Sequence, residues 1–185
     1  MDLMPFDELN RFGRELPIHF EDGKIRSKED EEDIIEELFE LFLLAYSTGR
    51  NVTEESLGNI VRVTLDEIMD TVDRKIAGKT WRERVSEYFE NGGTEDDIVR
   101  IAETETHRIS NESAFETAKK AGATKKTWHC MMLPTSRDSH IYLDGVEAPI
   151  DGEFYSINGG STQFPGQWGI AEEDVNCLCW LTYKR

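Results

Sequence analysis

Long apolar runs are missing from this sequence. The longest extends only from Leu41 to Tyr46, far short of the roughly 20 apolar residues that a membrane-spanning helix needs. The first residues include acidic side chains and lack the basic-then-apolar pattern of a secretory signal. Neither export nor membrane insertion is therefore expected.

Cysteine is scarce, with three residues in a chain of 185. Two of them, Cys177 and Cys179, are separated by one residue, a spacing that does not suit a structural disulfide framework. A chain of this length can bury roughly 70% of its unfolded surface without such cross-links. The sequence therefore predicts a reducing compartment and a fold held together by its core.

Basic residues are too few to balance the acidic ones. Lys and Arg number 21 against 38 Asp and Glu, which gives a net charge of −17. Because neutralisation of phosphates by cations drives nucleic-acid binding, direct contact with nucleic acid is not expected. Eight of the twelve residues from Glu29 to Glu40 are acidic. They are either the solvated start of a helix, favoured there by the helix dipole, or a docking surface for a basic partner.

Helical periodicity is abundant before Gly122. Residues 1–28 show no sustained period and are expected to form a partly ordered N-terminal arm that docks on a partner. Residues 29–122 are expected to form a helical region. Its predicted helices run from Glu29 to a stop at Gly49, from a cap at Thr53 to Ala77, from Thr80 to Asn91, and from Thr94 to Ala121.

The pattern changes to short strands and turns after Gly122. Strands are expected at residues 127–132, 146–150, 154–157 and 179–183, with a tight turn at Asp144-Gly145. The predicted fold class is therefore α+β, with a helical N-terminal half followed by a small antiparallel α+β module at residues 123–185.

Potential metal ligands concentrate in this C-terminal module. His140, Cys177 and Cys179 supply an imidazole and two thiolates, a set suited to a structural zinc ion, and Asp138, His129 or Cys130 could be the fourth ligand. Against this, alternate residues on a regular strand point to opposite faces, so Cys177 and Cys179 can grip one ion only if the backbone turns. The alternative is a set of buried thiols and a histidine that holds a loop by hydrogen bonds.

Catalytic interpretations have less support. Cys177 with His140 could form a thiol enzyme, but no glycine-rich oxyanion loop or helix start lies beside the cysteine. Glu103 and His107 share one helical face but lack a second His or Glu, so an exposed or capping role is expected. The stretch from Phe164 to Trp168 is either core or an exposed anchor for a partner.

Several of these motifs occur in an order that resembles a known family. Between Ile98 and Cys179 the chain contains IAETETHRISNES, then TSRDSHIYLDG, then the closing Asn-Cys-Leu-Cys. This order is similar to that of the phage head morphogenesis family, the Mu F-like minor head proteins. The matching positions are Arg137, Asp138, His140, Gly145, Phe154, Asn176, Cys177 and Cys179. Leu178 and Thr135 depart from the family pattern, where an arginine and an acidic residue are usual.

The resemblance implies a low-copy virion protein in the phage head, present in the host cytoplasm during assembly. Such a protein would contact portal protein, major capsid protein or both in head morphogenesis, DNA packaging or DNA delivery, without catalysis. Two alternatives belong to other classes. One is a metal- or thiol-dependent enzyme, and the other is an acidic host-directed regulatory protein that imitates nucleic acid.

Overall fold

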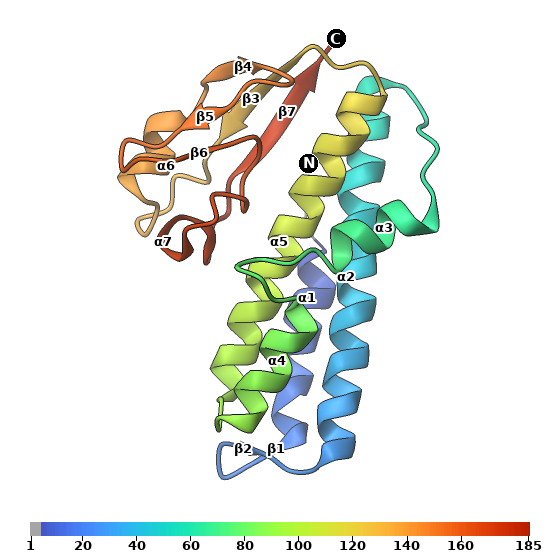
Figure 1. The fold of residues 1–185 in the computed structure, drawn as a ribbon, viewed down its shortest axis with the longest axis vertical. Coiled ribbons are helices and arrows are strands. Elements are labelled where there is room, and N and C mark those ends of the chain that lie inside the picture. The colour runs from blue at the N-terminus through green and yellow to red at the C-terminus, as the bar shows by residue number, and fades with distance from the viewer. Residues whose placement is uncertain (1–4) are drawn as a thin grey trace.

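One long helix, α5 (Glu95–Lys120), runs through both halves of the fold (Figure 1). The computed structural model describes residues 5–185. The first part of α5 lies in a bundle of helices, and its last part lies beside a set of short strands. Within residues 5–185, no helix has both the length and the apolar character needed to cross a membrane.

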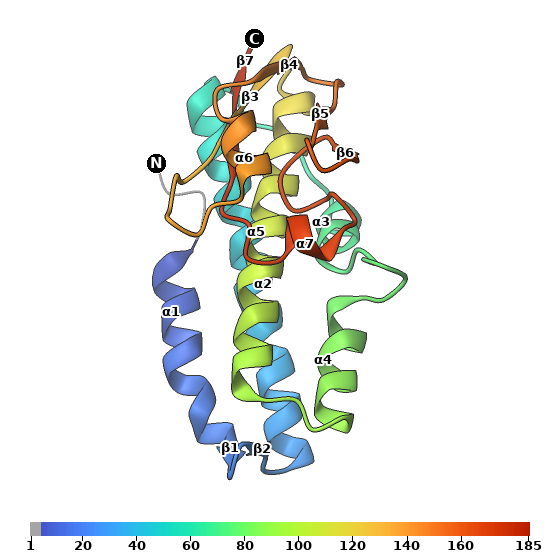
Figure 2. The ribbon, with the colours of Figure 1, turned by 90° about the vertical axis from the view of Figure 1, so that its left-hand side faces the viewer.

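The helical half packs around α5 and α2 (Lys28–Leu57), which lie side by side in both views (Figures 1 and 2). The predicted caps at Thr80 and Thr94 form capping boxes, so α4 (Trp81–Glu90) and α5 begin where the sequence indicates. The three helices bury one apolar cluster, which includes Ile34, Leu38, Phe42, Trp81, Val85, Ile98, Ala102 and Ile109.

The segment before α2 contains a helix that sequence reasoning did not predict. Residues 1–4 of the expected arm lie outside the described residues. The remainder forms α1 (Phe6–Glu15), a 3-10 turn η1 (Leu16–His19), and the small hairpin of β1 (Phe20–Glu21) and β2 (Lys24–Ile25). Phe12 and Leu16 are buried in the same cluster as α2. Phe6, Leu9, Phe12 and Leu16 lie on one face at helical spacing, and this short apolar pattern is the signal that could have revealed the helix.

The predicted helix break at Gly49 is wrong, because α2 continues through it to Leu57. Gly49 lies where α2 crosses α5, and a Cβ added there would lie 2.0 Å from the carbonyl oxygen of Ser110. Glycine is needed here for close backbone approach rather than to end the helix. The predicted cap Thr53 is also interior to α2, and its hydroxyl donates to the Gly49 carbonyl at 2.9 Å.

The predicted helix from Thr53 to Ala77 is only partly present. Residues 58–64 are not helical, and α3 covers Leu65–Val72 alone, with Thr64 and Glu67 forming its capping box. Gly58 ends α2 with a φ of 61°, which glycine adopts at little cost. The apolar periodicity was misleading here, since Ile60 and Leu65 are 84% and 70% exposed.

The C-terminal half is built on a three-stranded antiparallel sheet with β3 (Lys125–His129) at its centre. Its neighbours are β4 (Glu147–Pro149) and β7 (Trp180–Lys184). A separate ribbon of β5 (Phe154–Tyr155) and β6 (Ser161–Thr162) and the short helices α6 (Asp138–Leu143) and α7 (Ala171–Asp174) complete the module. The α+β fold class is confirmed. The four predicted strands are all present, although shorter or shifted at their ends.

A second apolar cluster joins this module to the end of α5. Ala114, Phe115 and Ala118 of α5 pack with the aromatic side chains of the module, which are Trp128, Phe154, Phe164, Trp168 and Tyr183. The ring of Trp128 meets that of Phe154 edge to face at a centroid distance of 5.1 Å. This cluster surrounds the side chains with metal-binding chemistry.

Candidate metal centre

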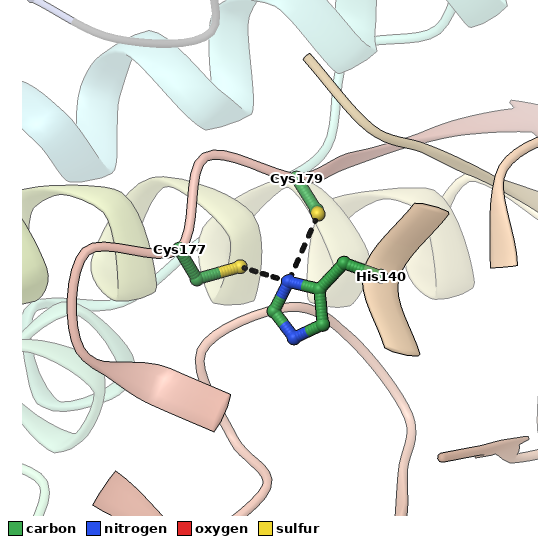
Figure 3. Close-up of side chains that lie close together, drawn as sticks. All are labelled: His140, Cys177 and Cys179. Carbon is green, nitrogen blue, oxygen red and sulfur yellow. Dashed lines mark hydrogen bonds between the residues drawn. The ribbon is translucent and has the colours of Figure 1, made fainter. Parts of the chain in front are cut away.

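His140, Cys177 and Cys179 converge in the C-terminal module (Figure 3). The Nδ1 atom of His140 lies 3.6 Å from Sγ of Cys177 and 3.4 Å from Sγ of Cys179. The three potential ligand atoms all lie within 4.8 Å of one another, and each residue is buried. The structure therefore brings together the three residues that the sequence singled out.

The backbone before β7 turns in a way that lets both cysteines face one point. Residues 177–179 precede the strand, and Asn176 adopts a φ of 55°. The amide of Cys177 donates to the carbonyl of Asp174 at 3.3 Å, which closes this turn. Alternate residues on a regular strand would point to opposite faces. Because Cys177 and Cys179 lie in irregular backbone between this turn and β7, that objection to a shared site does not apply.

The imidazole of His140 is held on its other side by Glu173. Nε2 lies 2.9 Å from a carboxylate oxygen of Glu173, a close ion-pair contact whose angle is poor for a hydrogen bond. The same carboxylate accepts hydrogen bonds from Ser139 at 2.9 Å, Ser156 at 3.0 Å and Asn158 at 3.1 Å. Glu173 is thus fixed by three donors, and it in turn leaves Nδ1 of His140 facing the sulfurs.

The two thiols are electrostatically unequal. The hydrogen bond from Cys179 holds the pKa of Cys177 well below its ordinary value, despite burial. The same pairing, together with burial, raises the pKa of Cys179. Burial lowers the pKa of His140, but the hydrogen bond and charge of Cys177 outweigh it and leave the pKa raised. The pairing therefore favours negative charge on Cys177 and disfavours it on Cys179.

The three residues predicted as possible fourth ligands lie at different distances from the site. Cys130 is 7% exposed and lines the same cavity of about 40 Å³ as the three converging residues. His129 instead stacks on Trp180 and contacts Thr182 at 2.8 Å. Asp138 is exposed at the start of α6. Of the three candidates, only Cys130 borders the site.

The remaining landmark residues shape the loops around the cluster. Arg137 donates to the carbonyl of Val175, which ties the start of α6 to the segment before Cys177. Gly145 has a φ of 76°, and its amide donates to the carbonyl of Trp128 at 2.8 Å. Phe154 is buried, whereas Asn176 is exposed at the turn. Arg137 and Asn176 also line the cavity beside the three converging residues, whereas Gly145 and Phe154 do not.

His107 lies in a different place from the one expected. Sequence reasoning expected an exposed or capping residue, but its side chain is buried and burial lowers its pKa. The apolar positions of α5 did not predict that His107 is buried, because the face of α5 that packs on the C-terminal module consists largely of polar residues. Among them, Asn111 donates to the carbonyl of Cys179 at 3.1 Å. This contact anchors the cysteine turn directly to the long helix.

The aromatic loop is core, so the alternative of an exposed anchor is wrong. Phe164 and Trp168 are 3% and 7% exposed. Between them Gly166 adopts a φ of 85°, and a Cβ there would lie 3.1 Å from Cα of Arg108. The backbone amides of Trp168 and Gly169 each donate to Asp174 at 2.8 Å. The loop is therefore held against α5 and the site.

A buried ionic cluster on α5 was not predicted. Arg108 is 2% exposed and donates to Glu105 at 2.8 Å and to Glu112 at 2.7 Å. Arg84 of α4 and Arg74 each contact one of these carboxylates at 2.6 Å. The sequence does contain a signal for this cluster. Opposite charges lie three and four residues apart on a helix face that is otherwise apolar. Glu173 offered no comparable signal.

Comparison with protein families gives a match over most of the chain. The profile of a family described as "Phage Mu protein F like protein" matches residues 62–182. The matched region contains α3, α4, α5 and nearly all of the C-terminal module, including every residue of the candidate metal centre. No solved structure shows a significant match.

Two curated proteins are similar to part of the chain. One is the NAD(+)--arginine ADP-ribosyltransferase EFV of Enterococcus faecalis, 40% identical over 85 residues. The other is the minor head protein GP7 of Bacillus phage SPP1, 37% identical over 86 residues. Each match covers 44% of this chain, but only 17% of the first protein and 28% of the second. The chain thus corresponds to less than a third of either relative.

Proposed function

Since the chain belongs to the Phage Mu protein F like family, we propose that it is a minor head protein of a tailed bacteriophage. In this role it acts by protein-protein contact in head morphogenesis, DNA packaging or DNA delivery, and it resides in the virion after assembly in the host cytoplasm. The observation that carries the proposal is the family match over residues 62–182. The name of the SPP1 relative supports it.

The geometry of the site supports a role without catalysis. The histidine and cysteines border a cavity of about 40 Å³, little more than the roughly 30 Å³ that one water molecule occupies in the liquid. Sites for small-molecule substrates typically measure roughly 300–1,000 Å³. The cavity is far smaller than such sites, which supports a role of these groups in the fold of the module.

The ADP-ribosyltransferase activity named in one relative is not carried over to this chain. The matched stretch is only 17% of that protein. We expect no transfer of ADP-ribose to an arginine-rich acceptor when the purified chain is incubated with labelled NAD+. Incorporation of label above a protein-free control would contradict this part of the proposal.

The proposed partners are portal protein, major capsid protein or both, and α2 offers a surface for them. Its first half exposes an acidic surface that consists of Glu29, Glu32, Asp33, Glu36 and Glu40. Beside it, a groove of about 430 Å³ between α1 and α2 is lined by further carboxylates, including Glu8, Glu15 and Glu37. Charge complementarity favours a basic segment of the partner.

Co-purification tests the proposal. The tagged chain is expressed with portal protein and major capsid protein of a phage whose genome encodes it, and captured proteins are identified. We expect at least one of the two to be retained. Failure to retain either, with all proteins soluble, would refute the assignment as a head protein that works by contact.

Charge reversal locates the contact. The triple variant Glu32→Lys, Asp33→Lys and Glu36→Lys changes only exposed residues of the acidic surface and is expected to reduce capture at least about tenfold. The matched control makes the same change in charge at other exposed positions, which are Glu55, Asp66 and Asp70. Equal loss of capture in both variants would show that net charge, rather than this surface, determines binding.

A further inference from the structure

We propose that His140, Cys177 and Cys179 bind one zinc ion, with Cys130 as its fourth ligand, and that the ion fixes the C-terminal module. The proposal does not depend on the role in the phage head, because it concerns the purified chain alone. The ion would join α6, the turn before β7 and the end of β3, segments that are far apart in sequence.

The distances fit a tetrahedral ion. Zinc–sulfur bonds of about 2.3 Å and zinc–nitrogen bonds of about 2.0–2.1 Å place sulfur and nitrogen about 3.6 Å apart at a tetrahedral angle. The observed separations from Nδ1 of His140 are 3.6 Å to Cys177 and 3.4 Å to Cys179. Both nitrogen–sulfur separations therefore already match the spacing that an ion between these atoms requires.

Hydrogen bonds alone can join these groups only as a chain, with Cys179 donating to Cys177 and Cys177 donating to Nδ1 of His140. A neutral imidazole has one acceptor nitrogen with one lone pair. The carboxylate of Glu173 lies 2.9 Å from Nε2 of His140, and its negative charge favours a proton on Nε2, with Nδ1 as the acceptor. Two sulfurs face that single lone pair. One ion between the three atoms would give each of them a partner.

The surroundings of His140 match those of a metal-bound histidine. Such a histidine usually places its other nitrogen against a carboxylate that is itself hydrogen-bonded, and this fixes the tautomer and the ring. Glu173 has this position, and Ser139 and Asn158 are among its donors. Glu173 is thus a positioning residue for the site rather than a ligand.

The donor set determines which ion is favoured. Thiolates with an imidazole suit zinc, whereas magnesium and calcium prefer oxygen ligands. Cys130 is the remaining thiol at the cavity of about 40 Å³. It lies outside the group whose ligand atoms are within 4.8 Å of one another, so it would have to move toward the ion to complete the Cys₃His set found in structural zinc sites. Such a site is closed, which agrees with its burial.

Metal content of the purified full chain tests the site. We expect about one zinc ion per chain after purification or after refolding with zinc. His140→Asn and Cys177→Ser should each lower retained zinc at least about tenfold. His129→Asn is the matched control, because His129 belongs to the same module but lies away from the cluster. Less than about a tenth of an ion in the wild type, or equal loss in the control, would overturn the proposal.

A second measurement keeps the test valid if ligand variants fail to fold. Glu173→Gln preserves side-chain size and should weaken zinc binding about 10–100-fold while the chain stays folded. In addition, cobalt replaces zinc in the wild type, and its thiolate charge-transfer absorption reports the number of sulfur ligands. We expect three, and two in Cys130→Ser. An unchanged spectrum in Cys130→Ser would overturn the assignment of the fourth ligand.

Discussion

Gly49 lies where the backbones of the two longest helices, α2 and α5, approach each other closely. A Cβ at this position would lie 2.0 Å from the Ser110 carbonyl oxygen, so Gly49→Ala must push α2 and α5 apart. We expect the variant to lose about 1–3 kcal/mol of unfolding free energy, the usual cost of overpacking, although alanine is the better helix former. Urea unfolding followed by circular dichroism measures the change.

Gly13 provides the matched control. It also lies inside a helix, α1, but a Cβ there would meet nothing within 4 Å. Gly13→Ala should therefore stabilise the protein by about 0.5–1 kcal/mol. If both alanine variants changed stability in the same direction, the close approach at Gly49 would not be the cause.

Lys126 gives the fold a distinct dependence on pH. Its side chain is fully buried, donates to the Gln163 carbonyl at 2.9 Å, and lies 4.6 Å from the ring centre of Phe115. Burial lowers its pKa to about 8. The unfolded chain, with the ordinary value near 10.5, then holds more protons between these two pH values. Stability contributed by this group must rise with pH across that window.

The comparison of wild type with Lys126→Met isolates this contribution. From pH 8 to pH 10.5, the wild type should gain about 3 kcal/mol relative to the variant, because 2.5 pKa units correspond to about that energy. Below pH 8 the difference between the two proteins should be constant. Parallel stability curves over the whole range would show that Lys126 titrates normally.

Site residues could be predicted from sequence when their residue type is rare in the chain, and were harder to find when that type is common. His140, Cys177 and Cys179 stood out by type and spacing, and the structure brings them together. Glu173 could not be found in the same way, because it is one of 38 acidic residues and only the folded chain places it behind His140.

The buried ionic cluster on α5 links this helix to the neighbouring helices α3 and α4. Arg108 joins Glu105 and Glu112 on α5 and also donates to the carbonyl of Thr71 on α3 at 3.1 Å. Arg108→Met would leave two buried carboxylates short of one partner each. We expect a loss of about 3–5 kcal/mol, measured by urea unfolding.

Two further variants show whether uncompensated charge is the reason. Adding Glu105→Gln and Glu112→Gln to Arg108→Met should recover part of the lost stability, because neutral amides replace the stranded carboxylates. Arg62→Met changes an exposed cation and should alter stability by less than about 0.5 kcal/mol. If the triple variant were less stable than Arg108→Met, lost packing rather than stranded charge would explain the effect.

Elements with local start and stop signals were predicted well, in contrast to those defined by tertiary contact. The capping boxes at Thr80 and Thr94 marked α4 and α5 correctly. Sequence could not show that Gly49 faces another backbone, so α2 was split, and its true end at Gly58 was overlooked. Helix α1 was missed because its apolar pattern, although helical in spacing, lasts for only 10 residues before Leu16 and Pro17 begin the next turn.

At the scale of the whole molecule, charge is the dominant property. A net charge of −17 leaves little cationic surface to release counterions from DNA. We expect the purified chain to pass through a duplex-DNA column at about 0.1 M salt, where charges still interact over roughly 10 Å. Retention that weakens steeply as salt increases would contradict this. A protein that does not adhere to DNA is suited to a head filled with it.

The helix α5 also has a mechanical consequence. Its 26 residues, at 1.5 Å each, form a rod about 39 Å long, and both apolar clusters are fastened to it. Because α5 is one continuous helix, no flexible linker separates the bundle from the strands along this path. A partner that tilted the bundle end of α5 would therefore also move the strands packed against its other end.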